Sequence, residues 1–441
     1  MPHSFQAPKG TRDLYPLDAA KRRFLLEAWR DASVRHGFEE VDGPTFEHLE
    51  LYTVKSGEGI VSELFSFQRA GGEKDYALRP EFTPTLARLY AAKANALPRP
   101  TKWFMAGPFF RAEKPQRGRL REFLQWNVDL LGDNSPHADA EVIACCIAML
   151  RGLGFTPKDL RVKINHRAAL SAWLESRGLA ADQHAALFKV LDQRGKLPPD
   201  EFAKQLAPFG FSADQAEVFT SGVIRVTLDQ DPTSPEVVDV TYFAQAVGPL
   251  VEALTQAGVL DWVDFDLSIV RGLAYYTGMV FEVHEASGAE RAVAGGGRYD
   301  GLVELFGGPS TPAVGFGMGD VVLSLVMQDR GLMPLDKDLL GKAGLRPDVF
   351  VISNGTPEAD SRVRLMVADL RAAGLHARHT YKTTKNVGKL LKEAGDQHAR
   401  AALIIESPEA ITLKDLSTGE QQQGPIDRAL QAVRTLLAQQ K

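Results

Sequence analysis

The sequence predicts an α+β protein built from an antiparallel sheet flanked by helices, a helical insertion and a C-terminal α/β domain. Three patterns predict this fold. Apolar and polar residues alternate with the period of a β-strand in 103–130, and strand-like runs return after residue 264. Residues 165–250 are rich in alanine and glutamine and mostly helical, whereas 346–441 alternates strands with single helices. That last pattern is typical of a mostly parallel sheet covered on both faces.

Composition limits the classes of function. The formal net charge of −5 and the pI near 6.1 exclude a globally basic nucleic-acid binder, but they allow a local basic patch. Cys145 and Cys146 are adjacent within an apolar run, which argues against a disulfide framework and against a cysteine-built zinc site. There is no signal-peptide pattern and no apolar run of membrane-spanning length. We therefore expect a cytoplasmic protein with no membrane partner and no metal site of its own.

The elements of the first 330 residues follow from local patterns. Helical spacing of apolar residues predicts a helix over 17–36, which stops at Gly37. Further predictions are a short strand over 38–44, a hairpin over 103–130 with a basic tip at 114–118, and a helix over 138–153. Strands are expected at 265–269, 280–283 and 292–294. A last helix is expected near Asp320, whose side chain could cap it.

The C-terminal segment is predicted as a separate unit. Its expected strands are 349–352, 375–379, 401–405 and 411–416, and its expected helices are 358–373, 387–399 and 426–439. The whole chain then divides into 1–164 and 251–330 as one domain, 165–250 as an insertion, 331–345 as a linker and 346–441 as the α/β domain.

The second strand of the hairpin has two unlike faces. Successive side chains of a strand point to opposite sides, so Glu122, Leu124, Trp126, Val128 and Leu130 form one face, which is mostly apolar. The other face carries Arg121, Phe123, Gln125, Asn127 and Asp129, an unusual set for plain solvent exposure. The first strand ends in Arg111 and Glu113, and basic residues continue through the tip. Such a density of arginine suits a polyphosphate or a nucleic-acid backbone. A solvated charged loop is the alternative.

This segment resembles motif 2 of class II aminoacyl-tRNA synthetases, in which Arg-x-Glu at a strand end is followed by a variable loop and a returning strand. The resemblance implies that Arg111 binds the α-phosphate of ATP and the carboxylate of the amino acid. It also implies that Glu113 accepts a hydrogen bond from the adenine amino group, that Arg119 reaches the terminal phosphates and that Phe123 stacks under adenine. Fixed guanidinium groups suit this chemistry because negative charge develops at the α-phosphorus during activation.

Two glycine- and arginine-bearing strings, RGLAYYTG at 271–278 and GGGRYDGL at 295–302, each follow a predicted strand. Alone, glycines mark turns or close contacts, and such tyrosines are ordinarily core residues. Together the strings resemble the two histidine-specific motifs of histidine–tRNA ligases, and 79–83 resembles that family's Arg-Pro-Glu-x-Thr. The resemblance implies that Arg271 lies by the α-phosphate and acts there with Arg111. The implied histidine-binding residues are Glu81, Thr83, Arg111, Gln125, Asp129, Arg271, Tyr275, Tyr276 and Tyr299.

The resemblance extends over nearly the whole chain. It implies ATP-dependent ligation of L-histidine to its tRNA through histidyl-adenylate, with Mg²⁺ on the β- and γ-phosphates. It also implies a homodimer formed through the helix and strand that end at Pro44. Gln116 and Arg117 at the hairpin tip are candidates for contact with tRNA. Lys385 and Lys389 share one face near the predicted helix at 387–399 and are candidates for anticodon contact, although such charges often form only a solvated face.

The sequence departs from the family at two positions. Val322 occupies the place of an arginine that stacks on adenine, and Ala274 occupies the place of the usual aspartate. These changes keep a second interpretation open, a catalytically inactive, synthetase-like regulatory subunit of histidine biosynthesis. That interpretation predicts loss of the motif 2 arginines and of the C-terminal domain, yet both are present.

Overall fold

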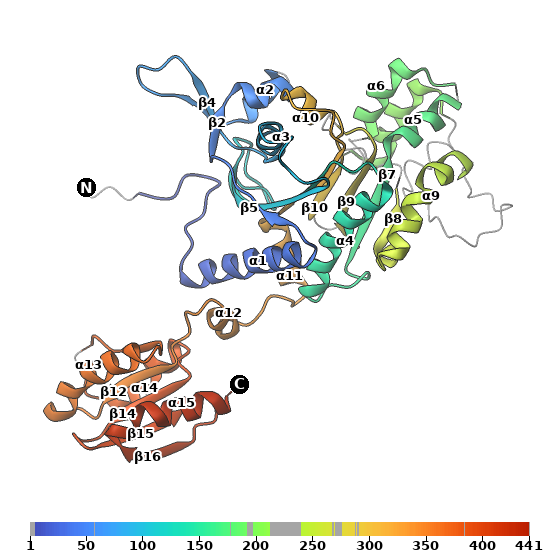
Figure 1. The fold of residues 1–441 in the computed structure, drawn as a ribbon. Coiled ribbons are helices and arrows are strands. Elements are labelled where there is room, and N and C mark those ends of the chain that lie inside the picture. The colour runs from blue at the N-terminus through green and yellow to red at the C-terminus, as the bar shows by residue number, and fades with distance from the viewer. Residues whose placement is uncertain are drawn as a thin grey trace. The chain divides into compact units, whose positions relative to one another are not determined.

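Figure 1 shows the fold, taken from a computed structural model of the 441-residue chain. The structure describes residues 5–56, 58–176, 178–191, 197–211, 240–266, 269, 276–286, 288, 291–382 and 384–440. Arg271, Ala274 and Tyr275 lie outside the described residues. The chain divides into two compact units. The first comprises Met1–Asp13 and Leu25–Met333, and the second comprises Leu14–Phe24 and Pro334–Lys441.

An eight-stranded sheet forms the centre of the first unit, with the strand order β1-β5-β6-β11-β10-β9-β7-β8. Its strands are β1 (Glu39–Glu40), β5 (Thr101–Phe110), β6 (Glu122–Leu131), β7 (Leu160–His166), β8 (Val263–Phe265), β9 (Met279–Glu285), β10 (Ala294–Arg298) and β11 (Ala313–Gly319). All neighbours are antiparallel except β1 with β5 and β7 with β8. The predicted antiparallel sheet is thus confirmed, although the strand expected over 38–44 is only the two residues of β1.

Helices cover both faces of this sheet (Figure 1). One face is covered by α1 (Pro16–Arg35), α4 (Pro136–Gly152) and α11 (Asp320–Asp329), and the other by α3 (Thr83–Ala91) and α10 (Leu302–Leu305). The apolar face of β6 meets α1, where the rings of Trp29 and Trp126 stack with centroids 6.3 Å apart. The Trp126 indole N–H donates to Ser33 Oγ at 2.9 Å, so the buried polar atom has a partner.

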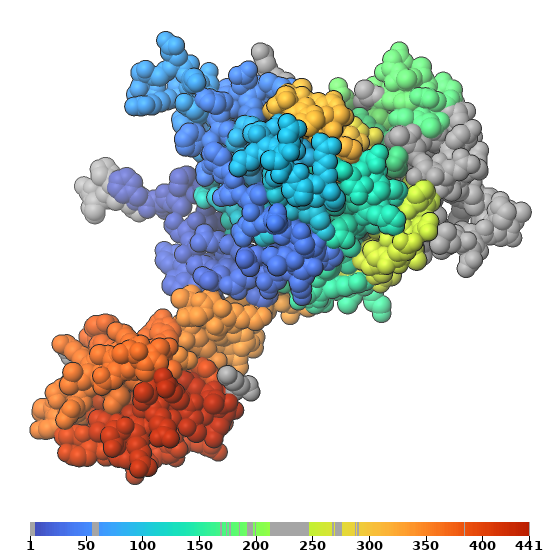
Figure 2. Space-filling model, in the orientation of Figure 1, coloured from blue at the N-terminus to red at the C-terminus, as the bar shows by residue number. Residues whose placement is uncertain are grey.

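The first unit also contains a second, smaller sheet, which the sequence does not predict. It has three strands in the order β2-β4-β3, namely β2 (Phe46–His48), β3 (Ser66–Gln68) and β4 (Asp75–Leu78). The helices α2 (Glu50–Ser56) and η1 (Glu58–Glu63) accompany it. In the space-filling view this light-blue region forms a lobe on the surface of the first unit (Figure 2).

The described part of 165–250 is mostly helical, as the sequence predicts, although its first two residues belong to β7. It contains α5 (Arg167–Ser176), α6 (Ala181–Leu191), α7 (Pro199–Leu206) and η2 (Ala207–Phe209). The helix α9 (Val240–Gln256) follows and packs against α4 and α5, and η3 (Leu260–Trp262) leads into β8. No described helix combines the length and the apolar character that crossing a membrane requires.

The glycine triplet 295–297 lies inside a central strand, not after one as the sequence analysis expects. A strand was predicted at 292–294, but β10 runs from Ala294 to Arg298. A Cβ on Gly296 would lie 2.1 Å from the carbonyl oxygen of Gly315 on the neighbouring strand. The triplet therefore permits a close approach of the two strands.

The second unit contains a five-stranded sheet in the order β13-β12-β14-β15-β16. Its elements are α12 (Asp336–Lys342), β12 (Val349–Ser353), α13 (Pro357–Ala372), β13 (Ala377–His379), α14 (Val387–Asp396), β14 (Ala401–Ile405), β15 (Ala410–Asp415), β16 (Gln421–Pro425), η4 (Ile426–Arg428) and α15 (Ala429–Gln439). Apolar clusters on both sides of the sheet confirm the predicted two-sided cover.

The expectation of a mostly parallel sheet is wrong for the last two strands of this unit. β12 pairs in parallel with β13 and β14, whereas β15 pairs antiparallel with both β14 and β16. The connection from β14 to β15 is too short for a crossover helix, and a short connection makes a hairpin. The sequence analysis did not predict β16, whose polar Gln421–Gln423 run lacks strand-like alternation.

The pairing of Ser33 with Trp126 predicts a measurable coupling. Ser33→Ala is expected to lower the free energy of unfolding by roughly 1–3 kcal/mol, because it leaves a buried indole N–H unpaired. In a Trp126→Phe background the same change should cost clearly less. Urea denaturation of the four proteins, followed by circular dichroism, measures the coupling. Equal costs in both backgrounds would contradict it.

Candidate active site

The hairpin of β5 and β6 carries most of the predicted site. The two strands pair over their full lengths, and Phe109 lies opposite Phe123. The connection between them closes on itself, because Gln116 and Arg119 exchange backbone hydrogen bonds of 3.0 and 2.9 Å. The side chains of Gln116 and Arg117 at this tip are exposed. The tip is therefore an ordered turn that presents polar side chains to the surroundings.

Two arginine and two phenylalanine side chains gather where the strands of the hairpin meet the loop that connects them. The Arg111 guanidinium lies 5.2 Å from the Phe123 ring centroid, and Phe123 stacks on Phe109 with centroids 6.2 Å apart. The Arg79 guanidinium lies 5.0 Å from the centroid of the Phe109 ring. A cation over an aromatic face is attracted to the negative charge of the ring. The stack holds the Arg111 guanidinium against the Phe123 ring.

The segment 79–83 lies against the end of this hairpin. Arg79 is buried, and its guanidinium donates to the Pro108 carbonyl at 2.9 Å and to Asp42 at 2.9 Å. The Arg111 Nε donates to the Pro80 carbonyl at 3.1 Å. Glu81 and Thr83, which follow directly, are therefore brought beside Arg111. The sequence pattern alone does not show that Arg79 has this anchoring role.

Three guanidinium groups gather around the hairpin tip. Arg119 forms an ion pair with Glu113, so these two predicted ATP-binding residues contact each other in the protein alone. Burial, together with the charges of Arg291 and Arg111, lowers the pKa of Arg119. Like charges in close proximity disfavour one another, so the tip holds a local excess of positive charge. No pattern in the sequence points to Arg291.

The polar face of β6 is buried, and glycines on β11 make this possible. Asn127 and Asp129 are almost fully buried, and the Gln125 amide donates to Asn127 Oδ1 at 2.8 Å. A Cβ on Gly315 would lie 2.0 Å from Asp129 Oδ1, and one on Gly317 would lie 2.6 Å from Gln125 Nε2. Side chains at these two positions would occupy the space of the polar groups.

Asp129 and Tyr299 form the innermost pair of this face. The Tyr299 hydroxyl donates to Asp129 Oδ1 at 2.5 Å. Burial raises the pKa of Asp129 to about 7, and the bond from Tyr299 opposes that rise. Among the described residues, the buried Asp129 Oδ2 has no hydrogen-bond partner. An orphaned carboxylate oxygen in a polar pocket is suited to accept a hydrogen bond from a ligand. Tyr276 packs close to Gly297 on β10 and is also buried.

The N-terminal segment ties the hairpin to α11. The Gly10 carbonyl accepts from the backbone N–H of Arg121 at 2.8 Å, and Arg12 forms an ion pair of 2.7 Å with Asp320. The other Asp320 oxygen accepts the backbone N–H of Leu124 at 2.9 Å. The helix begins at Asp320 as predicted, but this carboxylate does not cap it. It binds the N-terminal segment and β6 instead.

Val322 packs against the hairpin tip. Its Cγ2 lies 3.3 Å from the position that a Cβ on Gly118 would occupy, and the side chain is buried. Arg330, later along the chain, pairs with Glu285 at 2.8 Å. Arg330 is therefore engaged elsewhere and does not take the place of an arginine at position 322.

Three further predicted residues, Arg117, Lys385 and Lys389, are exposed. Arg117 pairs with Asp329 of α11 at 3.6 Å, a contact between two exposed side chains. Lys385 and Lys389, in the second unit, are exposed near the start of α14. Arg271 and Tyr275 lie outside the described residues.

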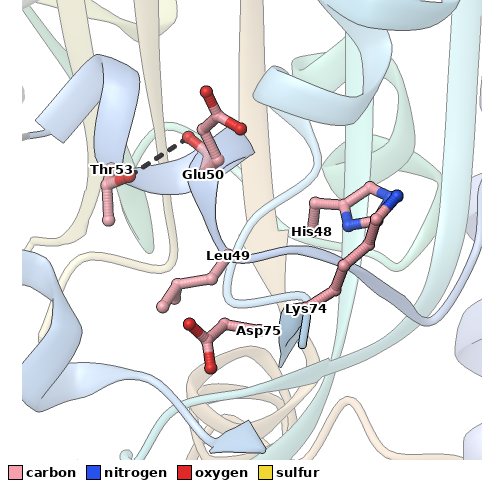
Figure 3. Close-up of a pocket in the computed structure, with 6 residues that line it drawn as sticks. All are labelled: His48, Leu49, Glu50, Thr53, Lys74 and Asp75. Carbon is pink, nitrogen blue, oxygen red and sulfur yellow. Dashed lines mark hydrogen bonds between the residues drawn. The ribbon is translucent and has the colours of Figure 1, made fainter. Parts of the chain in front are cut away.

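A surface hollow beside the small sheet is separate from this site. It is lined by His48, Leu49, Glu50, Thr53, Lys74 and Asp75, none of which is a predicted site residue (Figure 3). Within it the Thr53 hydroxyl donates to the Glu50 carbonyl at 3.2 Å. The buried polar face of β6 and the arginines near it therefore remain the candidate active site.

A family model and curated relatives place the chain in the same family. Residues 10–319 match the family described as histidyl-tRNA synthetase. The histidine–tRNA ligase of Haloarcula marismortui is 37% identical over 431 residues, covering 96% of each chain. That of Opitutus terrae is 37% identical over 446 residues, covering 98% of each chain.

Solved structures show the same fold. The crystal structure of histidyl-tRNA synthetase from Nostoc superposes with a TM-score of 0.75 and 24% sequence identity, covering 98% of this chain and 100% of the other. That from S. aureus gives a TM-score of 0.68, covering 98% of this chain and 100% of the other at 23% identity. With the family match over residues 10–319 and curated relatives at 37% identity, the chain belongs to the histidyl-tRNA synthetase family.

Proposed function

We propose that this protein ligates L-histidine to its cognate tRNA in an ATP-dependent reaction through a histidyl-adenylate. The observation that carries the proposal is one buried polar strand face, with an unpaired carboxylate oxygen at Asp129 and arginines at Arg111 and Arg119. Curated relatives at 37% identity over nearly the full chain bear the name histidine–tRNA ligase. The regulatory-subunit interpretation has no comparable support.

The proposed histidine site lies along the inner part of β6. An imidazole N–H donates to Asp129, whose orientation is held by the bond from Tyr299. Gln125, Tyr276 and, from outside the described residues, Tyr275 complete the walls. Glu81 and Thr83 hold the α-amino group. Such a polar pocket rejects apolar amino acids because they would leave its buried groups unpaired.

The proposed ATP site lies at the outer end of the same strand. ATP enters as its Mg²⁺ complex, in which the metal neutralises charge on the β- and γ-phosphates. Arg111 holds the α-phosphate and the histidine carboxylate in contact, and Arg271 acts beside it. Phe123 stacks under adenine, and Glu113 accepts a hydrogen bond from the adenine amino group. Glu113 must exchange its present bond with Arg119 for this contact, which frees Arg119 for the terminal phosphates.

The two steps of the reaction follow from this arrangement. The histidine carboxylate attacks the α-phosphorus, pyrophosphate leaves, and Arg111 and Arg271 stabilise the charge that develops there. The terminal ribose hydroxyl of tRNA then attacks the activated carbonyl, and AMP leaves. Guanidinium groups that are already held in position stabilise this charge without reorganising during the reaction.

Partners and domain roles complete the proposal. Gln116 and Arg117 contact the acceptor end of tRNA, and Lys385 and Lys389 contact its anticodon region. Residues 1–164 and 251–330 form the catalytic domain, 165–250 an insertion, 331–345 a linker and 346–441 an anticodon-binding domain. The protein acts in the cytoplasm as a homodimer.

Histidine-dependent exchange between ATP and labelled pyrophosphate tests the activity directly. The purified full chain is expected to exchange label with histidine and not with other amino acids. Attachment of labelled histidine to its tRNA tests the second step. Absence of exchange with every amino acid would reject the ligase function and favour the regulatory interpretation.

The raised pKa of Asp129 predicts a pH dependence of histidine binding. Below about pH 7 this carboxyl is mostly protonated in the folded protein, and above it the ionised form accepts the imidazole N–H. The KM for histidine should therefore fall between pH 6 and 8. Asp129→Asn should raise the KM and reduce this pH dependence. Histidine itself titrates in the same range, so the comparison with the variant isolates the contribution of Asp129. A KM that rises with pH in the wild-type protein would contradict this assignment.

The space that Gly315 leaves for Asp129 predicts a second effect. Gly315→Ala should raise the KM for histidine about tenfold or more, because the new methyl group displaces the carboxylate and leaves the imidazole unpaired. Gly319→Ala, on the same strand, is the matched control, since the nearest heavy atom to its Cβ would lie 4.0 Å away. Thermal melting of both variants separates loss of fold from loss of binding. Equal KM values in two folded variants would reject the spatial argument.

A further inference from the structure

Arg291 lies where three separate segments of the first unit meet. It precedes β10, and β10 pairs with β11, which leads into α11 and Val322. From the position that a Cβ on Gly118 would occupy, Arg291 Cδ is 4.0 Å away and Val322 Cγ2 is 3.3 Å away. The arginine side chain therefore extends to the hairpin tip, beside the residue that lies where the family resemblance implies an arginine.

Positively charged side chains gather around Arg119. Arg291 and Arg111 are close enough to Arg119 for their positive charges to disfavour its protonated form. Glu113 pairs with Arg119, and Glu63 is the further carboxylate that favours its charge. Within the described part of the chain, Arg291 itself forms no ion pair or hydrogen bond, and it is exposed. Converging guanidinium groups are stabilised by a multiply charged anion.

The hairpin tip has an apolar neighbour from α11 and a charged neighbour from the segment before β10. Val322 is buried against Gly118 and offers only apolar contact. A guanidinium from α11 is absent at this position, but one reaches the same place from the other side, through the segment before β10. Because Arg119 is the residue proposed for the terminal phosphates, its neighbour Arg291 is placed for the same anion.

We propose that Arg291 binds the terminal phosphates of ATP, which it reaches from the segment before β10. The inference rests on the assignment of the arginine cluster to ATP in the proposed function. It makes Arg291 a substrate-binding residue that acts through the β- and γ-phosphates. AMP, which lacks these phosphates, should not require it.

Equilibrium binding of MgATP and of AMP to the full chain, without histidine or tRNA, tests this inference. Arg291→Ala should weaken ATP binding about tenfold, as expected for loss of a charge-assisted hydrogen bond, and should change AMP binding less than about twofold. The ATP affinity of Arg291→Lys should lie between those of Arg291→Ala and the wild type, because lysine keeps the charge and loses the planar fork of the guanidinium. Arg69→Ala removes another exposed arginine, near the turn between β3 and β4, and should change neither affinity.

The opposite outcomes are equally distinct. Unchanged ATP affinity in Arg291→Ala, or an equal loss for ATP and AMP, would overturn the role at the terminal phosphates. Unchanged ATP affinity with a raised KM for tRNA would overturn it as well and assign the guanidinium to the nucleic acid. Binding is measured without turnover, so the result is separate from the test of ligase activity. A protein that shows the ATP-specific loss but no histidine-dependent exchange would keep this inference and lose the proposed function.

Discussion

The glycines of β10 and β11 are the constraint on which the site depends. Glycines at 315 and 317 leave the volume that the carboxylate of Asp129 and the amide of Gln125 occupy, and Gly296 lets the two strands approach closely. A polar strand face could not be buried beneath ordinary side chains without losing its hydrogen-bond geometry. Burial then gives Asp129 its raised pKa and leaves one of its oxygens for a ligand. Glycines of the neighbouring strand therefore make the buried polar face of β6 possible.

One strand face carries two kinds of electrostatic environment. At its inner end a carboxylate is removed from water and held by Tyr299, so it can discriminate between ligands by hydrogen bonding. At its outer end Arg111 is held by a ring and by the Pro80 carbonyl. Such positively charged groups are already in place before a polyphosphate arrives, which reduces the reorganisation that catalysis requires. The distance between the two ends is set by strand geometry alone.

Contacts between residues far apart in sequence hold this strand in place. Asp320 accepts both the Arg12 guanidinium and the backbone N–H of Leu124, so the N-terminal segment, β6 and α11 are fastened at one buried carboxylate. On the other side, Arg79 joins the segment before α3 to β5 through the Pro108 carbonyl. A charged group removed from water needs such partners, and each of these groups has them. The two contacts restrain the hairpin at both of its strands.

The sequence by itself determined the two faces of β6 and most helices and strands of the second unit, because strand alternation and helical spacing report burial locally. It also identified Arg111 and Asp129 as chemical groups. It did not predict the small three-stranded sheet or β16. Tertiary structure decided what covers each face: the glycines opposite Asp129, the bond between Arg12 and Asp320, and the position of Arg291. The antiparallel direction of β15 was likewise missed. Local periodicity contains no information on which distant segment supplies a neighbour, and a glycine reads equally as a turn or as space for another side chain.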